Sequence, residues 1–421
     1  MIAIYFLIIL LSSLQSYSIY AERYHPLAKL WKVDDTEVPE LLERERKLIL
    51  IDEILRPILE QDDFISSFGG TYLEIFENHI VVNTVNYSKV DDLLALSQIT
   101  PHEAFLYFKE ANNSMSQIKS NFEQISLQAS LIKPQKVYIY TDMLINNNVI
   151  YILDSNLNNT KFINAIKPFN PTIIHANNPP ASQNITQSQY VVDSRGLEVE
   201  VLGGDGLYNE ASGVKCSVGF WATNIYDPNE FYIITAGHCY NSDFHNNLFY
   251  YTPWGSESPV LLIGSMVFDF LEYYDFGVIH LDGEDVSPTF SVRNDDADGY
   301  RELIITGDAP ASSHGVHICK SGRATHFSCG YVLGLNGIFV LGEEGSTYDL
   351  IITNMYGGYS DSGGVVVSFV SSENLLSVVV HGIIVTVGPE DCTAQSIDTI
   401  FNELKKQTRY DLTLYLGGSR D

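Results

Sequence analysis

The stretch GYSDSGGVVV, residues 358–367, places Ser362 in front of two glycines and an apolar, strand-like run. Gly363 and Gly364 allow the backbone to turn tightly beside the serine and to present its N–H groups inward. Taken alone, a serine followed by two glycines is typical of a flexible turn. The meaning of this stretch therefore depends on what stands elsewhere in the chain.

Two further strings carry polar residues beside strand-like runs. TAGHC, residues 235–239, places His238 directly after an apolar strand, and DFGVIHL, residues 275–281, places Asp275 at the head of another. A hydroxyl nucleophile needs a base to take its proton, a carboxylate to orient that base, and amide donors for the developing oxyanion. Alone, His238 is typical of a structural histidine, and Asp275 of a strand-end cap or a surface charge. Together with Ser362 they form a candidate catalytic set.

These strings resemble those of the chymotrypsin-like serine proteases, in which the histidine, aspartate and serine follow in this order along the chain. More narrowly, the resemblance is to the streptogrisin and α-lytic protease branch. It rests on five strings, which are GGDGLYNEASGVKCSVGFWA at 203–222, TAGHC at 235–239, DFGVIHL at 275–281, CKSGRATHFSCG at 319–330 and LIITNMYGGYSDSGG at 350–364.

The resemblance implies an all-β domain of two six-stranded antiparallel β-barrels, with His238 and Asp275 in the first and Ser362 in the second. His238 would be the general base, Asp275 would orient it, and Ser362 would form the acyl-enzyme. The backbone N–H groups of Ser360 and Ser362 would form the oxyanion hole. The expected protein is a serine endopeptidase that acts on proteins or peptides without a cofactor or a metal ion.

All five cysteines lie in the second half of the chain. The resemblance pairs Cys216 with Cys239 and Cys319 with Cys329. A zinc site is the rival interpretation of four cysteines, but the spacing lacks the CxxC pairs typical of such sites. The odd count leaves Cys392 without an obvious partner, either buried or linking two chains.

The sequence departs from the pattern of the resembling branch at three places. Ser360 stands where a glycine provides the first oxyanion donor, and its side chain could restrict the backbone. Tyr356 stands where a third disulfide would place the partner of Cys392. Asp361 would pair with a basic residue at position 320. There Lys320 replaces the usual arginine, and its ammonium group is a point charge without the two parallel N–H donors of a guanidinium. The alternative for Lys320 is a solvated surface charge.

The strand that lines the primary substrate pocket in the resembling branch usually carries serine followed by glycines. Here it reads VTVG at 385–388, so either Val385 or Thr386 takes the serine position, depending on a one-residue gap. The β-branched side chains of Val385, Thr386 and Val387 would narrow the pocket. Small or medium side chains are therefore expected before the cleaved bond. These departures also favour a second hypothesis, a secreted protease homologue that binds protein without cleaving it.

The first 21 residues, MIAIYFLIILLSSLQSYSIYA, contain an apolar run of about ten residues followed by polar and small residues. This order predicts a secretory signal peptide and a secreted, extracellular protein. A membrane anchor is the competing interpretation, but a spanning helix needs about 20 apolar residues. We expect no membrane association after the signal is removed.

Between the signal and the barrels, the sequence predicts an α+β region. Helical spacing covers residues 38–61, where Pro57 would kink or end the helix, and further helix-like runs cover 101–112 and 115–131. FGGTYLEIFENHIVVNTVN, residues 68–86, alternates as two strands with a turn at 77–78. We find no internal repeat in the sequence.

The polar, proline-containing sequence HANNPPASQNITQSQ, from residue 175, is typical of a linker. We therefore divide the chain into a signal at 1–21, a pro-region at 22–195 and a protease domain at 196–421, with the pro-region as the protease's own folding partner. An independent binding domain retained in the mature protein is the alternative. N-glycosylation acceptors occur only before the domain boundary, and they are Asn86, Asn112, Asn158 and Asn184.

Composition excludes other classes of function. The 421 residues are 45% apolar and only 18% charged, which is typical of a folded protein, and the formal net charge is −28. Residues 201–421 hold 9 basic and 28 acidic residues, so they carry a net charge of −19. Such a surface repels nucleic acid and anionic membranes. We expect no nucleic-acid partner, and a monomer.

Overall fold

The computed structural model describes residues 24–176, 198–240, 247–388, 391–408 and 410–417. The predicted signal peptide, the domain boundary near residue 195 and Asn184 lie outside these ranges. Asn86, Asn112 and Asn158 are all exposed. No helix within the described ranges is both long and apolar enough to cross a membrane.

The N-terminal half, residues 24–176, combines helices with short strands, as the sequence predicted. Its helices are α2 (Pro26–Trp31), α3 (Val38–Leu59), α4 (Val90–Leu94), α5 (Met115–Ile132) and α6 (Thr160–Ile166). Its strands are β1 (Phe68–Glu74), β2 (His79–Thr84), β3 (Leu106–Glu110), β4 (Gln135–Asp142), β5 (Asn147–Ile152) and β6 (Thr172–His175). Helix α3 continues past Pro57 and ends two residues later.

The helix expected over residues 101–112 is wrong. A short 3-10 helix, Thr100–Phe105, is followed there by strand β3, which pairs in parallel with β2. The free edge of β2 supplies hydrogen-bond partners that the local sequence pattern does not reveal. Tertiary pairing therefore overrides the helical spacing in this segment.

The N-terminal half repeats one topology. In each copy a helix precedes an antiparallel hairpin, and a second helical segment then leads to a third strand parallel to the second. The first copy is α3-β1-β2-α4-β3 and the second is α5-β4-β5-α6-β6. The sequence does not show this repeat because the two copies share a connection order and not a residue pattern.

The C-terminal half, residues 198–417, contains an eight-stranded sheet. Its order is β23-β10-β11-β14-β13-β12-β8-β9. The strands are β8 (Gly206–Asn209), β9 (Lys215–Ser217), β10 (Phe220–Asn224), β11 (Phe231–Thr235), β12 (Leu248–Thr252), β13 (Leu261–Phe270), β14 (Phe276–His280) and β23 (Leu412–Leu414).

Six later strands close into an antiparallel ring, which we call the six-stranded ring. Its pairings run from β17 through β18, β19, β22, β21 and β20 back to β17. They are β17 (His317–Gly322), β18 (His326–Leu341), β19 (Ser346–Thr353), β20 (Val365–Phe369), β21 (Ser377–Val387) and β22 (Cys392–Ser396). Strands β16 (Glu302–Asp308), β15 (Val286–Arg293) and β7 (Val199–Gly203) extend the sheet from β21, and helix α7 (Ile397–Gln407) follows β22.

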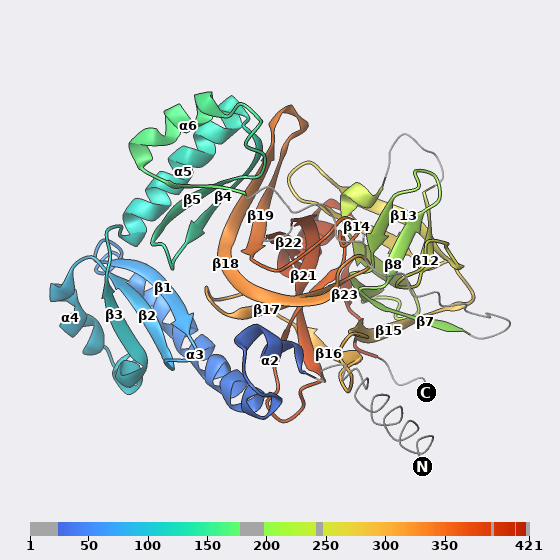
Figure 1. Ribbon diagram of the computed structural model, residues 1–421, viewed down its shortest axis with the longest axis horizontal. Helices are drawn as coiled ribbons and strands as arrows, with labels where there is room; N and C mark the ends of the chain where they lie inside the picture. Colours follow the sequence, from blue (N-terminus) through green and yellow to red (C-terminus); the bar gives the residue numbers. More distant parts are fainter. Residues whose placement is uncertain (1–23, 177–197, 241–246, 389–390, 409, 418–421) are drawn as a thin grey trace, which may run out of the picture.

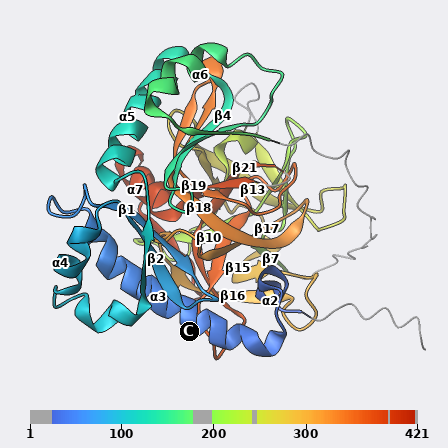
Figure 2. The same cartoon turned by 60° about the vertical axis from the view of Figure 1, so that its left-hand side comes forward.

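The two halves of the chain share a sheet and a core. Strand β4 pairs with the long strand β18, so the small sheet β4-β5-β6 continues the ring (Figure 1). Helix α3 is the long helix that crosses the lower part of Figure 2. Leu48, Ile51 and Leu55 of α3 belong to one apolar cluster with Ile318 and Ile351 of the ring. The N-terminal half therefore completes the core of the six-stranded ring.

Two disulfides are present, Cys216–Cys239 and Cys319–Cys329. The first joins β9 to the segment that carries His238, and the second joins β17 to β18. Cys392 is a free cysteine and is buried. Burial raises the pKa of its thiol to about 12, so the thiol stays protonated and unreactive at neutral pH.

Candidate active site

His238 and Asp275 form a directly bonded pair. His238 lies in a short 3-10 turn immediately after β11, and Asp275 directly precedes β14, which pairs with β11. The Nδ1 atom of His238 lies 2.6 Å from Oδ2 of Asp275, and the His238 backbone N–H donates to Oδ1 at 3.1 Å. The pairing of the two strands therefore brings together residues that lie 37 positions apart.

The geometry of this pair sets the tautomer of His238. Because Nδ1 is bonded to a carboxylate, it carries the proton, and Nε2 makes no hydrogen bond with any described residue. Burial lowers the pKa of His238, but the charge of Asp275 and its hydrogen bond raise that pKa by more. The net pKa lies above the ordinary value. The imidazole is therefore oriented with its second nitrogen available as a base.

Ser362 lies in the loop between β19 and β20, close to the segment that carries His238. Its carbonyl oxygen accepts a hydrogen bond from the Ser217 backbone N–H at 2.8 Å. A Cβ added to Gly363 would lie 2.0 Å from Oγ1 of Thr235 and 2.9 Å from the nitrogen of Ala236. The loop thus packs against the end of β11. Within the described residues, the Ser362 hydroxyl makes no hydrogen bond with His238.

Two backbone N–H groups beside the serine have no acceptor in the part of the chain that the structure describes, those of Ser360 and Ser362. Between them, the N–H of Asp361 donates to the Gly358 carbonyl at 3.0 Å. Ser360 adopts a φ of 81°, in the left-handed region that favours glycine. Its carbonyl accepts a hydrogen bond from the Ser217 hydroxyl at 2.7 Å, which holds it in this conformation.

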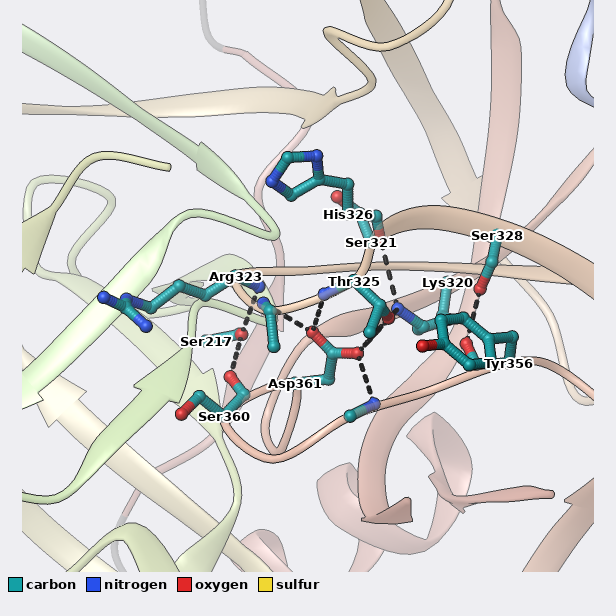
Figure 3. Close-up of polar contacts among 12 residues, drawn as sticks. Ser217, Lys320, Ser321, Arg323, Thr325, His326, Ser328, Tyr356, Ser360 and Asp361 are labelled. Atoms are coloured by element: carbon teal, nitrogen blue, oxygen red, sulfur yellow. Dashed lines mark hydrogen bonds and ion pairs between the residues drawn. The ribbon is translucent and has the colours of Figure 1, made fainter. Parts of the chain in front are cut away.

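The Asp361 side chain anchors this loop to Lys320 and to residues 324–325 (Figure 3). Its carboxylate lies 2.8 Å from Nζ of Lys320, and both side chains are fully buried. It also accepts hydrogen bonds from the Gly358 N–H at 3.0 Å and the Ala324 N–H at 2.7 Å. Burial raises the pKa of Asp361, but Lys320 and Thr325 lower it by more, so the carboxylate stays ionised. The alternative of a solvated Lys320 is wrong.

The three residues assigned to the substrate pocket lie on β21, next to the N-terminal half. Val385 is buried in an apolar cluster with Tyr138 of β4. The hydroxyl of Tyr138 lies 2.5 Å from Oγ1 of Thr386, which also bonds Thr393 at 2.8 Å. Val387 is half-buried. The N-terminal half therefore covers this stretch of β21 in the intact chain.

Sequence reasoning missed Gln395 and Tyr138. Gln395, from β22, accepts a hydrogen bond from the Asp275 backbone N–H at 3.2 Å and is fully buried. The only signal for it was a polar residue in the short strand CTAQS before the last helix. Nothing in the sequence around Tyr138 indicates a contact with a residue 248 positions later.

The comparisons with known proteins found similarity only among solved structures. No family model and no curated protein matches the chain. The solved structures include Thermobifida fusca protease A, at 20% identity over 52% of this chain and 100% of that one, with a TM-score of 0.40. The Cellulomonas bogoriensis chymotrypsin has the same identity and coverages, with a TM-score of 0.39. The α-lytic protease homologue N4 is 25% identical over 52% of this chain and 100% of its own, with a TM-score of 0.38.

Proposed function

We propose that this protein is a secreted serine endopeptidase made as a precursor, with His238, Asp275 and Ser362 as its catalytic residues. The observation that supports this most is the pair of hydrogen bonds from His238 to Asp275, which leaves Nε2 of the imidazole available. The second support is the loop of Ser362, which packs against the end of the strand that leads to His238.

The proposed reaction runs through an acyl-enzyme. Oγ of Ser362 attacks the peptide carbonyl carbon while its proton passes to Nε2 of His238. The tetrahedral intermediate collapses, the bond to the amine breaks, and the amine takes the proton from Nε2. Water then attacks the ester, gives its proton to Nε2, and Ser362 recovers that proton as the acid product leaves. Asp275 keeps Nδ1 protonated and stabilises the imidazolium throughout.

The backbone N–H groups of Ser360 and Ser362 would stabilise the negative oxygen in each tetrahedral intermediate. Each such donor is typically worth a factor of about 10²–10³ in kcat. The anchorage of Asp361 supports this oxyanion-hole role. Its buried ion pair with Lys320 fixes the loop, and with it the N–H groups on either side of Asp361. Donors that need no reorientation during the reaction are the most effective.

Residues 22–195 would act as a pro-region, and residues 196–421 would form the protease domain. Support comes from α3, which contributes apolar side chains to the core of the six-stranded ring, and from β4, which pairs with β18. Non-local strand pairing makes barrels slow to fold, and a preformed partner lowers that cost. The contact of Tyr138 with Thr386 would also keep substrate away until cleavage.

For the mature enzyme we propose protein or peptide substrates with small or medium side chains before the cleaved bond, because Val385, Thr386 and Val387 are all β-branched. Profiling with a peptide library tests this assignment. A dominant preference for Phe, Tyr or Trp would contradict it.

The second candidate is a protease homologue that binds protein without cleaving it. Two observations favour it. Ser360 has a left-handed backbone at a proposed oxyanion donor, and the Ser362 hydroxyl makes no hydrogen bond with His238 among the described residues. Catalytic hydrogen bonds often tighten only when substrate binds, so the second observation is compatible with both functions.

A fluorophosphonate probe applied to the protein secreted from a full-length gene separates the candidates. The endopeptidase should label, Ser362→Ala should not, and the loop variant Ser371→Ala should label like the wild type. Ser362→Ala should also lower kcat on a peptide substrate by roughly 10⁴–10⁶-fold. A folded, processed protein that neither labels nor cleaves would be the binding homologue.

The N-terminus of the labelled species tests the precursor. We expect it near residue 196. A labelled species that begins near residue 22 would instead show that the N-terminal half is a retained domain. Whether the pro-region assists folding is tested separately by refolding residues 196–421 with and without residues 22–195 added in trans. Full refolding without the pro-region would contradict this role.

A further inference from the structure

Gln395 is buried between the eight-stranded sheet and the six-stranded ring of the C-terminal half. It lies on β22, which pairs with β19 on one side and β21 on the other, so its backbone is held within the six-stranded ring. Its side chain reaches out of the ring to Asp275, which directly precedes β14 of the eight-stranded sheet. The Gln395 side chain thus connects the ring with the segment that carries the carboxylate partner of the proposed base.

Every polar group of the Gln395 amide has a backbone partner. Oε1 accepts from the Asp275 N–H at 3.2 Å, and Nε2 lies 3.4 Å from the Tyr348 carbonyl and 3.3 Å from the Asp349 carbonyl. Only oxygen can accept from an N–H, and only nitrogen can donate to carbonyls, so the network determines how the amide is oriented. The side chain is therefore fixed at both ends.

The carboxylate and the backbone N–H of Asp275 have different partners. The carboxylate holds His238 through two hydrogen bonds, and the N–H is held by Gln395. Among the described residues, Gln395 is the only side chain of the six-stranded ring that hydrogen-bonds Asp275. The side chains of Val385 and Thr386 do not hydrogen-bond Asp275. That of Val385 is apolar, and the Thr386 hydroxyl bonds Tyr138 and Thr393.

We propose that Gln395 is a positioning residue, which sets the placement of Asp275 and through it the orientation and basicity of His238. This inference rests on the proposed function. The competing role is purely structural, with Gln395 only satisfying the two carbonyls of β19. The two roles differ in one measurable respect: a positioning residue changes the ionisation of His238, whereas a carbonyl partner changes only stability.

The test is an NMR titration of His238 in the full chain carrying Ser362→Ala, where no activity is needed. The His238 signal is assigned from its loss in His238→Gln. Gln395→Met keeps the length of the side chain and removes both hydrogen-bonding ends. We expect the pKa of His238 to fall by roughly 0.5–1 unit, because a loosened Asp275 supports the imidazolium less well.

Thr399→Val is the matched control. The Thr399 hydroxyl bonds the Asp349 carboxylate, so this variant removes a hydrogen bond from the same network and leaves the bond between Gln395 and Asp275 in place. We expect a similar loss of thermal stability and no change in the pKa of His238. In the processed enzyme with Ser362 intact, Gln395→Met should lower kcat by roughly 10–100-fold, with little change in KM.

A second variant keeps the test informative if Gln395→Met does not fold. Gln395→Glu has the same size, and its ionised form places a negative charge beside Asp275, which should raise the pKa of His238. An unchanged His238 pKa in the variants that fold would overturn the positioning role. Suppose that the pKa of His238 shifts while the protein with Ser362 intact is never labelled by the fluorophosphonate probe. That result would support the positioning role and refute the proposed function, so failure of the inference and failure of the proposed function are distinguishable.

Discussion

Glu45 of helix α3 accepts two hydrogen bonds from His317 of strand β17, 272 positions later in the chain. The His317 backbone N–H donates to Oε1 at 2.8 Å and its Nδ1 to Oε2. Both side chains are almost fully buried. The arrangement matches that of Asp275 with His238, with one difference: Nε2 of His317 accepts a hydrogen bond from the Phe369 N–H at 2.9 Å. Both ring nitrogens of His317 are therefore occupied by partners within the protein, so this pair fastens the N-terminal half to the ring.

The first prediction concerns this fastening. In Glu45→Gln the amide can accept only one of the two hydrogen bonds, and its NH₂ group faces a buried donor. The free energy of unfolding of the full chain should fall by about 1–3 kcal/mol, measured by urea denaturation. Glu40→Gln, which breaks an exposed pair with Arg44, is the control and should change stability by less than about 0.5 kcal/mol. Equal effects would contradict the assignment.

The second prediction concerns acid. Burial, opposed in part by backbone hydrogen bonds, lowers the pKa values of His25, His314 and His381 to about 4. Their ordinary value is about 6.5 in the unfolded chain. Between these two pH values the unfolded chain holds protons that the native chain does not, so the free energy of unfolding falls as the pH falls from about 6.5 to about 4.

His25 should show this effect most directly at the interface between the halves, because its ring bonds the Leu375 carbonyl and packs against Tyr300 and Phe369 of the C-terminal half. Urea denaturation at several pH values should give a shallower dependence for His25→Gln than for the wild type. The exposed His175→Gln should follow the wild type. A wild-type stability that is flat between pH 6.5 and 4 would refute the assignment.

The third prediction concerns the proposed base. Because Asp275 raises the pKa of His238 above its ordinary value, kcat/KM should fall with acid through a midpoint above about pH 6.5. Asp275→Asn should lower kcat by about 10⁴-fold and move the midpoint to lower pH. Asp282→Asn disrupts a comparable but more exposed pair with His280 and should leave both quantities unchanged. A pH profile without an acid limb would point to a different base.

The fourth prediction concerns Ser360. Its φ of 81° costs a residue with a side chain about 1 kcal/mol, and glycine adopts it freely. Ser360→Gly should therefore stabilise the protein by up to about 1 kcal/mol and leave kcat unchanged or higher, measured by thermal unfolding and peptide hydrolysis. Ser312→Gly, at a loop position without a positive φ, should destabilise slightly. A large loss of stability in Ser360→Gly would show that the serine side chain has another role.

Much of the local structure could be predicted from the sequence. Helix α3 begins at Val38 as expected, and the two strands around the turn at Asn78 are present. Each depends on residues within about 20 positions of one another, where apolar periodicity and turn residues are informative. The helix prediction for residues 101–112 failed because the pairing partners of this segment, on the edge of β2, lie 26 positions earlier in the chain.

The sequence by itself determined the order of the chemical groups: a histidine and an aspartate each beside a strand, a serine before two glycines, and four cysteines that the family resemblance assigned to two pairs. These are short strings, and their meaning depends on residue type and order. Only the tertiary structure decided which residues lie in contact with these groups and with one another. The contacts of Glu45 with His317, Tyr138 with Thr386, and Gln395 with Asp275 join residues 120 to 272 positions apart. No local periodicity encodes such contacts, because they form only when packing of the apolar faces brings distant strands and helices together.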